Sequence, residues 1–237
     1  GLDAIETAGL DRVFLSNNPT KRPVAYESRF ASAGFDVDRE EVFTAGTITT
    51  EYLTAEHADD RLFVIGDPGL DSQLSAAGLT LTDDPEAADA LVASMDREFG
   101  YGTLVDAIVA LDRSIPFIGT DPDMLIPQTG HDIPGTGAML HAIEGVTDRS
   151  VDVICGKPSP FARRTVLEYL DHPPEECLVV GDRLDTDIKL GAAAGMTTAV
   201  VRTGVTDDET LAASPLSPDY VLDSLAELDA VLDGRAD

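Results

Sequence analysis

Short apolar runs alternate with longer segments of helical spacing along most of the chain. Runs that are rich in β-branched and aliphatic residues are typical of strands, and they occur at residues 13–15, 62–65, 90–93, 117–118, 151–154, 178–180 and 198–201. The segments of helix length between them are residues 22–33, 101–111, 137–143, 161–170 and 186–194. This alternation predicts an α/β protein with a parallel sheet covered by helices.

Polar motifs stand at the ends of three of these expected strands. Ser-Asn-Asn begins at Ser16, Gly-Lys-Pro contains Lys157, and Gly-Asp-Arg-Leu-Asp-Thr-Asp begins at Gly181. In doubly wound parallel sheets, ligands bind at the carboxyl ends of the strands, where the strand order reverses. We therefore expect the three motifs to lie on the rim of one sheet, within reach of the same bound anion.

The middle of the chain has βα units of its own and carries none of the three motifs. We expect residues 1–54 and 151–237 to form a core domain in two parts. Residues 55–150 are then an inserted α/β domain.

The third motif offers two carboxylates, Asp182 and Asp187, close to the start of a helix. Mg²⁺ binds through oxygen atoms, using one or two carboxylates together with water and phosphate. The alternative is a Gly-Asp turn followed by a helix that Asp185 or Thr186 caps. By themselves, the residues leave both interpretations open.

The other two motifs fit a phosphate group. The ammonium of Lys157 could neutralise phosphate oxygens, although a lysine in a loop is often only solvated surface. Ser16 offers a hydroxyl donor, and the backbone amides that follow it could cradle a phosphate. Asn17 or Asn18 could orient a neighbouring loop, and the alternative here is an Asx turn at the end of a strand.

Composition narrows the classes of partner. The 237 residues include 44 acidic side chains against 16 basic ones, of which only three are lysines, and the net charge is −28. This charge argues against nucleic acid or an anionic membrane as the principal partner, and no run is long enough to span a membrane. An acidic chain with so few lysines suggests a halophilic protein, and we expect a cytoplasmic location.

The motifs together resemble the haloacid dehalogenase (HAD) superfamily. FLSNNPTK, GKPSP and VVGDRLDTDIKLGAAAGM are similar to its large-cap branch, which contains NagD-type nucleotidases, p-nitrophenylphosphatases and phosphoglycolate phosphatases. FIGTDPDMLIP and IPGTGAMLHAIE resemble the inserted cap domain of that branch. The resemblance implies a doubly wound core, a cap domain, and Mg²⁺-dependent hydrolysis of small phosphate monoesters. Dimers that form through the cap are common in similar proteins, so a homodimer is compatible with it.

The resemblance also implies roles for individual residues. Ser16, with Asn17 and Asn18 in the same loop, binds the phosphoryl group, and Lys157 stabilises its charge. Asp182 is a Mg²⁺ ligand, and Asp187 holds either the water molecules of the metal or Lys157. In the cap, Asp121 and Asp123 stand where the branch presents groups to the substrate.

One part of the family pattern has no counterpart in the sequence. The reaction of the family begins with an aspartate in an Asp-x-Asp motif on the first, central strand of the core, which forms an aspartyl-phosphate. The pairs Asp36/Asp38 and Asp121/Asp123 have this spacing but follow a helix and match the cap, respectively. We therefore expect this strand to be missing through truncation, and the 237-residue form to be inactive. The alternative is a phosphate-binding or nucleotide-binding relative without catalysis.

Overall fold

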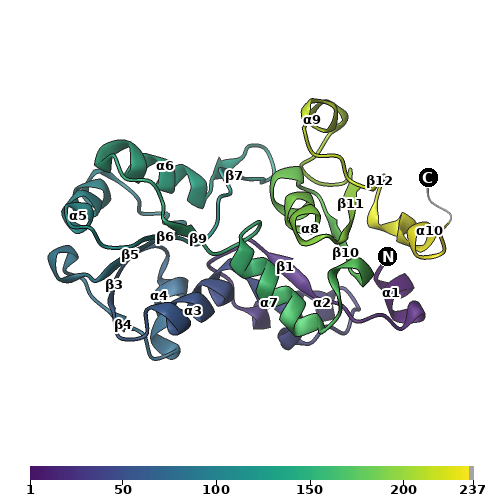
Figure 1. The fold of residues 1–237 in the computed structure, drawn as a ribbon, viewed down its shortest axis with the longest axis horizontal. Coiled ribbons are helices and arrows are strands. Elements are labelled where there is room, and N and C mark those ends of the chain that lie inside the picture. Colours follow the sequence, from purple (N-terminus) through teal and green to yellow (C-terminus); the bar gives the residue numbers. More distant parts are fainter. Residues whose placement is uncertain (235–237) are drawn as a thin grey trace. The chain divides into compact units, whose positions relative to one another are not determined.

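The structure is a computed structural model that describes residues 1–234. The chain forms two compact units (Figure 1). We call them the central unit, Leu15–Gly156, and the terminal unit, which is Gly1–Phe14 together with the chain from Lys157 onward. Each unit contains a parallel sheet flanked by helices, so the predicted α/β class is confirmed.

The central unit is built on a five-stranded parallel sheet with the order β4-β3-β5-β6-β9. These strands are β3 (Arg61–Ile65), β4 (Thr80–Leu81), β5 (Ala90–Ala93), β6 (Phe117–Gly119) and β9 (Val153–Ile154). The helices of this part are α3 (Ala45–Glu56), α4 (Pro68–Ala76), α5 (Tyr101–Leu111) and α6 (Thr136–Thr147). Every residue of β5 and β6 is buried, which is typical of parallel strands that are covered on both faces.

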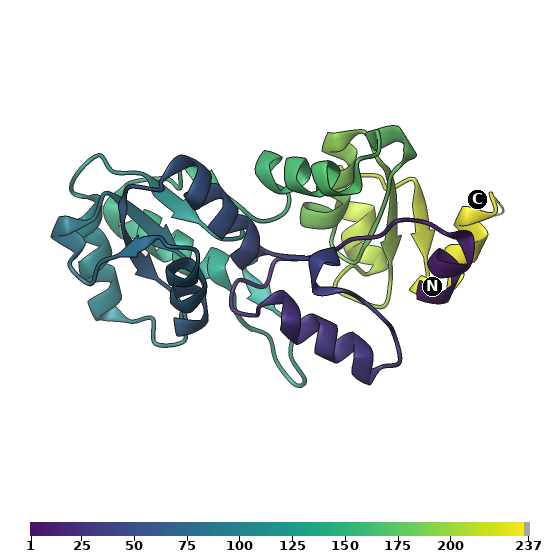
Figure 2. The ribbon, with the colours of Figure 1, turned by 90° about the horizontal axis from the view of Figure 1, so that it is seen from below.

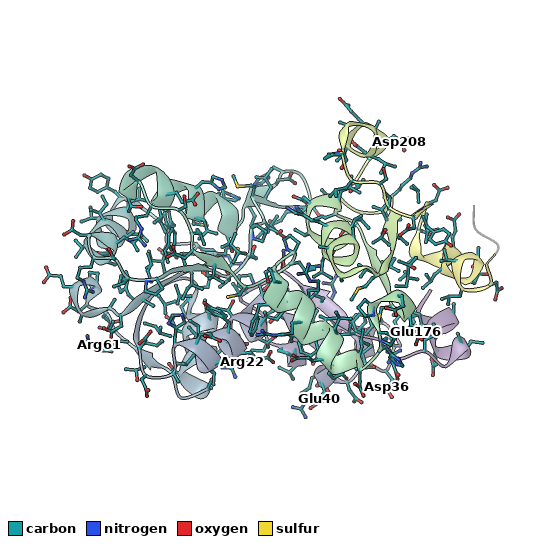
Figure 3. All side chains as sticks on the ribbon, in the orientation of Figure 1. Arg22, Asp36, Glu40, Arg61, Glu176 and Asp208 are labelled. Carbon is teal, nitrogen blue, oxygen red and sulfur yellow. The ribbon has the colours of Figure 1, made fainter. Side chains whose placement is uncertain are left out.

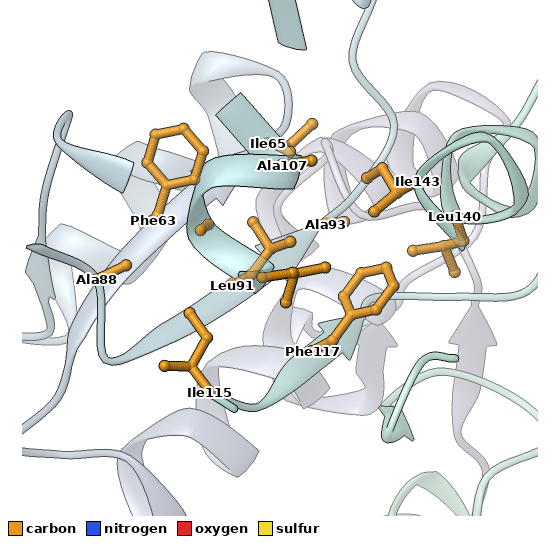
Figure 4. Close-up of a cluster of buried hydrophobic side chains, with 12 residues drawn as sticks. Phe63, Ile65, Ala88, Leu91, Ala93, Ala107, Ile115, Phe117, Leu140 and Ile143 are labelled. Atoms are coloured by element: carbon orange, nitrogen blue, oxygen red, sulfur yellow. The ribbon is translucent and has the colours of Figure 1, made fainter. Parts of the chain in front are cut away.

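A cluster of buried hydrophobic side chains joins this sheet to α5 and α6 (Figure 4). Leu91, Phe117 and Ile143 are all fully buried within it. Burial of a large apolar side chain stabilises a fold by about 1.5–3 kcal/mol. Val151 and Ile154 pack against the same cluster, and this packing holds β9 in the central sheet.

The remaining elements of the central unit lie outside this sheet. β1 (Phe14–Ser16), whose first residue belongs to the terminal unit, pairs with β2 (Val42–Thr44), and β7 (Leu125–Ile126) pairs with β8 (Ile133–Pro134) in an antiparallel hairpin. The helical elements are α2 (Pro23–Ser32) and two short 3₁₀ helices, Arg39–Glu41 and Pro85–Ala87.

The terminal unit contains three parallel strands, β10 (Leu178–Gly181), β11 (Thr197–Val201) and β12 (Tyr220–Leu222). Its α-helices are α1 (Leu2–Ala8), α7 (Pro160–Leu170), α8 (Lys189–Ala194), α9 (Asp208–Ala213) and α10 (Leu228–Leu232). A π-helix, Leu184–Ile188, leads into α8, and Pro174–Glu176 and Leu225–Glu227 are 3₁₀ helices. α1 packs beside α10, as Figures 1 and 2 show, so the first helix of the chain is part of this unit.

The three strands that carry the polar motifs belong to three different sheets. β1 pairs with β2, β9 pairs with β6, and β10 pairs with β11. The pairing of β9 differs from the expectation of one shared sheet, whereas the expected absence of a central strand between β1 and β10 already implies that these two strands do not pair with each other. For β9 the reason is local: besides its packing, the Cys155 N–H donates to the carbonyl of Gly119 at 2.9 Å. The expected domain division at 54/55 and 150/151 differs from the unit boundaries at 14/15 and 156/157. Compactness does not reveal an insertion, so that division stays a prediction.

Acidic side chains are spread over the solvent-exposed surface. Asp36, Glu40, Glu176 and Asp208 are all exposed and come from well-separated parts of the sequence (Figure 3). In residues 1–234, no helix combines the length and apolar character that crossing a membrane requires.

Candidate active site

Lys157 and Asp187 form an ion pair within the terminal unit. The Lys157 Nζ lies 2.6 Å from Asp187 Oδ1, and the two side chains are only 12% and 9% exposed. The Arg183 N–H donates to the other oxygen, Asp187 Oδ2, at 3.1 Å. Asp187 therefore fixes Lys157, which is one of the two roles expected for it, and the interpretation of Lys157 as a solvated surface lysine is wrong.

A π-helix positions Asp187. The N–H groups of Asp187 and Ile188 both donate to the carbonyl of Arg183, each at 3.1 Å. The sequence predicts a regular helix over residues 186–194, but the π-helix Leu184–Ile188 precedes α8. Single π-turns occur frequently at functional sites, because the wider turn redirects a side chain.

Asp182 is held by the loop that follows β11. Its Oδ2 accepts a hydrogen bond from the Val205 N–H at 3.0 Å. Its backbone carbonyl accepts from both the N–H and the hydroxyl of Thr206, at 3.1 and 2.8 Å. Within the described part of the chain, Asp182 Oδ1 accepts no hydrogen bond, so this oxygen is available to a ligand.

Two glycines allow these carboxylates to approach the backbone. A Cβ atom at Gly181 would overlap the side chain of Asp187, and one at Gly204 would overlap the carboxylate of Asp182. Neither glycine has a positive φ, so close approach is the reason for its small size. Any larger residue would displace a carboxylate.

The carboxylate of Asp182 fits a divalent cation as one member of a ligand set. Among residues 1–234, no group of three or more His, Cys, Asp or Glu side chains is arranged to hold a metal ion. Mg²⁺ does not need such a group, because it is often bound by one or two carboxylates, with water and phosphate oxygens completing the octahedron. Asp182 provides a carboxylate oxygen of this kind, whereas both oxygens of Asp187 already accept hydrogen bonds.

Ser16 lies at the end of β1, in the central unit. Its Oγ is 2.9 Å from the hydroxyl of Tyr26, and it accepts a hydrogen bond from the Asn18 N–H at 3.2 Å. When Tyr26 donates, both lone pairs of the Ser16 oxygen are used, and its proton is free for an acceptor such as phosphate. The arrangement is compatible with the predicted donor role of Ser16.

The two asparagines after Ser16 differ in their environment. Asn18 Oδ1 accepts from the N–H groups of Thr20 and Lys21, at 2.9 and 3.0 Å, so its side chain forms an Asx turn. Asn17 is buried, and its Nδ2 donates to Asp123 Oδ1 at 3.0 Å. Asn17 thus orients a neighbouring loop, which is one of the two alternatives that the sequence left open.

Asp121 is buried among neutral hydrogen-bond donors. Its Oδ2 accepts from the hydroxyls of Thr120 and Thr136 at 3.0 and 2.6 Å, and its Oδ1 accepts from the Asp123 N–H at 3.2 Å. Burial raises the pKa of Asp121 to about 7, and the charge of Asp123 adds to this effect. With 2% of its surface exposed, Asp121 is enclosed by protein. Its predicted contact with substrate stays a prediction.

Sequence reasoning missed the residues that hold the predicted ones in place. The Val205 and Thr206 segment could have been found, because it too follows the end of an apolar strand run. No local sequence signal identifies Tyr26 or Thr136, because each meets its partner only through the fold.

Family comparisons agree with these motifs. Residues 1–80 match the family model described as haloacid dehalogenase-like hydrolase, and residues 154–228 match a model described as HAD-hydrolase-like. The chain is 32% identical to an acid sugar phosphatase of Staphylococcus aureus over 232 residues, which are 98% of this chain and 89% of that protein. It is 31% identical to a dihydroxyacetone phosphatase of Corynebacterium glutamicum over 228 residues, 96% of this chain and 82% of that protein.

Solved structures give the same result. The p-nitrophenyl phosphatase from Archaeoglobus fulgidus superposes with a TM-score of 0.90 at 32% identity, covering 97% of this chain and 89% of that one. NagD from Escherichia coli superposes with a TM-score of 0.84 at 30% identity, covering 95% and 88%. This chain therefore belongs to the haloacid dehalogenase-like hydrolases, in the branch that contains NagD and the p-nitrophenylphosphatases.

Proposed function

We propose that the motif residues serve the Mg²⁺-dependent hydrolysis of small phosphate monoesters. The observation that carries the proposal is the nearly buried Lys157–Asp187 ion pair in the same unit as Asp182, which among residues 1–234 keeps one carboxylate oxygen without a hydrogen-bond partner. The relatives named as dihydroxyacetone, acid sugar and p-nitrophenyl phosphatases support small phosphorylated metabolites as the substrate class.

Each residue has a defined task in this proposal. Asp187 holds the Lys157 ammonium in one position, so that it can neutralise phosphoryl oxygens without first reorganising. The Ser16 hydroxyl donates to a phosphoryl oxygen, and Asn17 and Asn18 shape the loop around it. Asp182 would hold Mg²⁺, which supplies Lewis-acid stabilisation of the charge that develops during phosphoryl transfer.

The nucleophile is not found among the aspartates that share its sequence spacing. Attack on phosphorus requires an ionised and accessible carboxylate. Asp121 is enclosed and has a raised pKa, and Asp36, the first aspartate of the other pair, lies in the loop after α2 and not at the end of a strand. These observations support the proposal that the 237-residue polypeptide by itself binds phosphate with Mg²⁺ but has negligible turnover.

Three further properties belong to the proposal. The spread of exposed acidic side chains supports a halophilic protein, whose thermal midpoint should rise in molar KCl. We also propose that the protein is cytoplasmic and forms a homodimer.

Calorimetric titration with inorganic phosphate, with and without Mg²⁺, tests the proposed function. We expect saturable phosphate binding that Mg²⁺ strengthens and that Lys157→Met weakens at least tenfold. Lys21→Met is the matched control, because Lys21 is exposed and lies outside the ion pair. Phosphate binding that neither Mg²⁺ nor Lys157→Met alters would overturn the proposed site. Robust hydrolysis of p-nitrophenyl phosphate would overturn only the proposed lack of turnover.

A further inference from the structure

A chain of hydrogen bonds in the central unit connects the loop after β6 with the loop after β1. Asp123, in the β6 loop, accepts from the side-chain amide of Asn17 at 3.0 Å. Asn17 is only 9% exposed and directly follows Ser16 in the sequence. A buried amide bonded to a carboxylate is a charge-assisted contact, which is stronger than a contact between neutral groups.

Both backbone groups of Asp123, its N–H and its carbonyl, form hydrogen bonds. Its N–H donates to Asp121 Oδ1 at 3.2 Å, and its carbonyl accepts from the Gly137 N–H at 2.9 Å, near the start of α6. The hydroxyl of Thr136 in turn holds Asp121. These bonds hold the backbone of Asp123 in place, so its carboxylate presents an acceptor from a fixed position.

The same loop also anchors the segment that precedes Lys157. The Gly156 N–H donates to the carbonyl of Thr120 at 2.7 Å, and Gly156 is buried. The four residues from Thr120 to Asp123 thus hold the neighbours in sequence of both Ser16 and Lys157. None of the hydrogen bonds in this arrangement needs a bound ligand.

We propose that Asp123 is a positioning residue that acts through Asn17 to fix the Ser16 loop in the geometry for binding phosphate. The inference rests on the proposed function, and it adds a role for a carboxylate that need not touch the substrate. As a carboxylate, Asp123 only accepts hydrogen bonds, so the Asn17 amide must turn its Nδ2 toward Asp123. That choice directs the carbonyl of the Asn17 side chain away from Asp123 and sets the loop in one arrangement.

Two measurements on the full chain test the inference. The first is hydrogen exchange of the backbone amides of residues 16–21 without phosphate, and the second is the affinity for inorganic phosphate with Mg²⁺. We expect Asp123→Ala to raise the exchange rates about tenfold and to weaken phosphate binding about tenfold, which corresponds to the loss of one hydrogen bond to a charged group.

Two further variants separate positioning from general damage to the structure. Asp123→Asn should restore most of both effects, because its side-chain oxygen can accept the same bond. Asn17→Ala should reproduce Asp123→Ala, and the double variant should be no worse than either single variant. Asp132→Ala, an exposed change in the hairpin of β7 and β8, is the matched control and should alter neither measurement.

The outcomes distinguish the two proposals. Unchanged exchange at residues 16–21 in both Asp123→Ala and Asn17→Ala would overturn the positioning role, whatever the phosphate result. Additive effects in the double variant would overturn it as well. If the wild-type chain does not bind phosphate but the exchange rates rise as expected, the proposed function fails, while Asp123 is still shown to fix the loop.

Discussion

Each unit of this protein contains a pair of aspartates that are close in sequence: Asp182 and Asp187 in the terminal unit, and Asp121 and Asp123 in the central unit. The two pairs have different hydrogen-bond partners. In the terminal unit, Asp187 forms an ion pair with Lys157, and Asp182 keeps one carboxylate oxygen that no described residue hydrogen-bonds. In the central unit, both oxygens of Asp121 accept from hydroxyl and backbone donors, and no cationic side chain of the described residues pairs with it.

The difference shows that the groups bonded to a buried carboxylate determine its role. A nearly buried carboxylate that is paired with a cation, as Asp187 is with Lys157, holds that cation in one position, where it can meet an incoming anion. A buried carboxyl with only neutral donors takes up a proton near neutral pH, which explains the pKa of about 7 for Asp121. The ion pair of Asp187 is suited to binding an anion, whereas the buried Asp121 is suited to holding neighbouring loops together.

The largest effect should come from the titration of Asp121. Its pKa is raised in the folded state, so the unfolding free energy should fall as the pH rises from about 4 to about 7. The shift corresponds to at most about 4 kcal/mol. Asp121→Asn should remove this dependence, which urea unfolding at constant KCl between pH 4 and pH 8 would measure. A stability difference between wild type and variant that does not change with pH would remove the contrast between the two pairs.

A change in the ion pair should come next. Lys157→Met should destabilise the fold by about 3 kcal/mol, because Asp187 is left nearly buried and without its cation. Adding Asp187→Asn should recover part of this loss, and Lys21→Met should cost less than about 0.5 kcal/mol. Equal stability of Lys157→Met and Lys21→Met in chemical denaturation would mean that the pair is not held as described.

A smaller effect is expected at the glycine beside Asp182. Gly204→Ala should destabilise by about 1–3 kcal/mol, because its Cβ would overlap the Asp182 carboxylate. Gly145→Ala in α6 is the control: apart from its chain neighbours and the backbone of its own helix, no atom of the described residues lies within 4 Å of its added Cβ, so a slight stabilisation is expected. Thermal unfolding of both variants measures the difference in stability. Similar unfolding midpoints would contradict the close approach of the Asp182 carboxylate to Gly204.

The smallest effect concerns the hydroxyl of Tyr26. Tyr26→Phe should weaken phosphate binding about threefold to tenfold, since Ser16 loses a neutral partner that frees its proton for phosphate. Calorimetry with inorganic phosphate measures this change. If Tyr26→Phe weakened phosphate binding as much as Lys157→Met does, the role of Tyr26 would be larger than orienting the Ser16 hydroxyl.

Local patterns in the sequence predicted much of the fold. The buried strands β5 and β6 coincide with the apolar runs at residues 90–93 and 117–118. α3 has no such signal: its threonine-rich sequence lacks a regular apolar stripe. Its start is stabilised instead by the reciprocal bonds of Thr44 and Thr47.

The candidate site was predictable as a set of motifs, but its bonding was not. Lys157 and Asp187 are 30 residues apart in sequence, and Asn17 and Asp123 are 106 apart, so no local pattern reveals that either pair is in contact. The sheet to which β9 belongs was missed for the same reason. An apolar run predicts a strand, whereas packing of Val151 and Ile154 against the buried cluster of the central unit decides which strand β9 pairs with.

The most direct measurement of the central claim is the effect of Mg²⁺ on phosphate affinity in Asp182→Asn, compared with Asp121→Asn. We expect Mg²⁺ to strengthen phosphate binding in the wild type and in Asp121→Asn, and we expect this effect to be lost in Asp182→Asn, whose amide is a poorer ligand for a hard cation. A Mg²⁺ effect that survives Asp182→Asn, or that is lost equally in both variants, would contradict that claim.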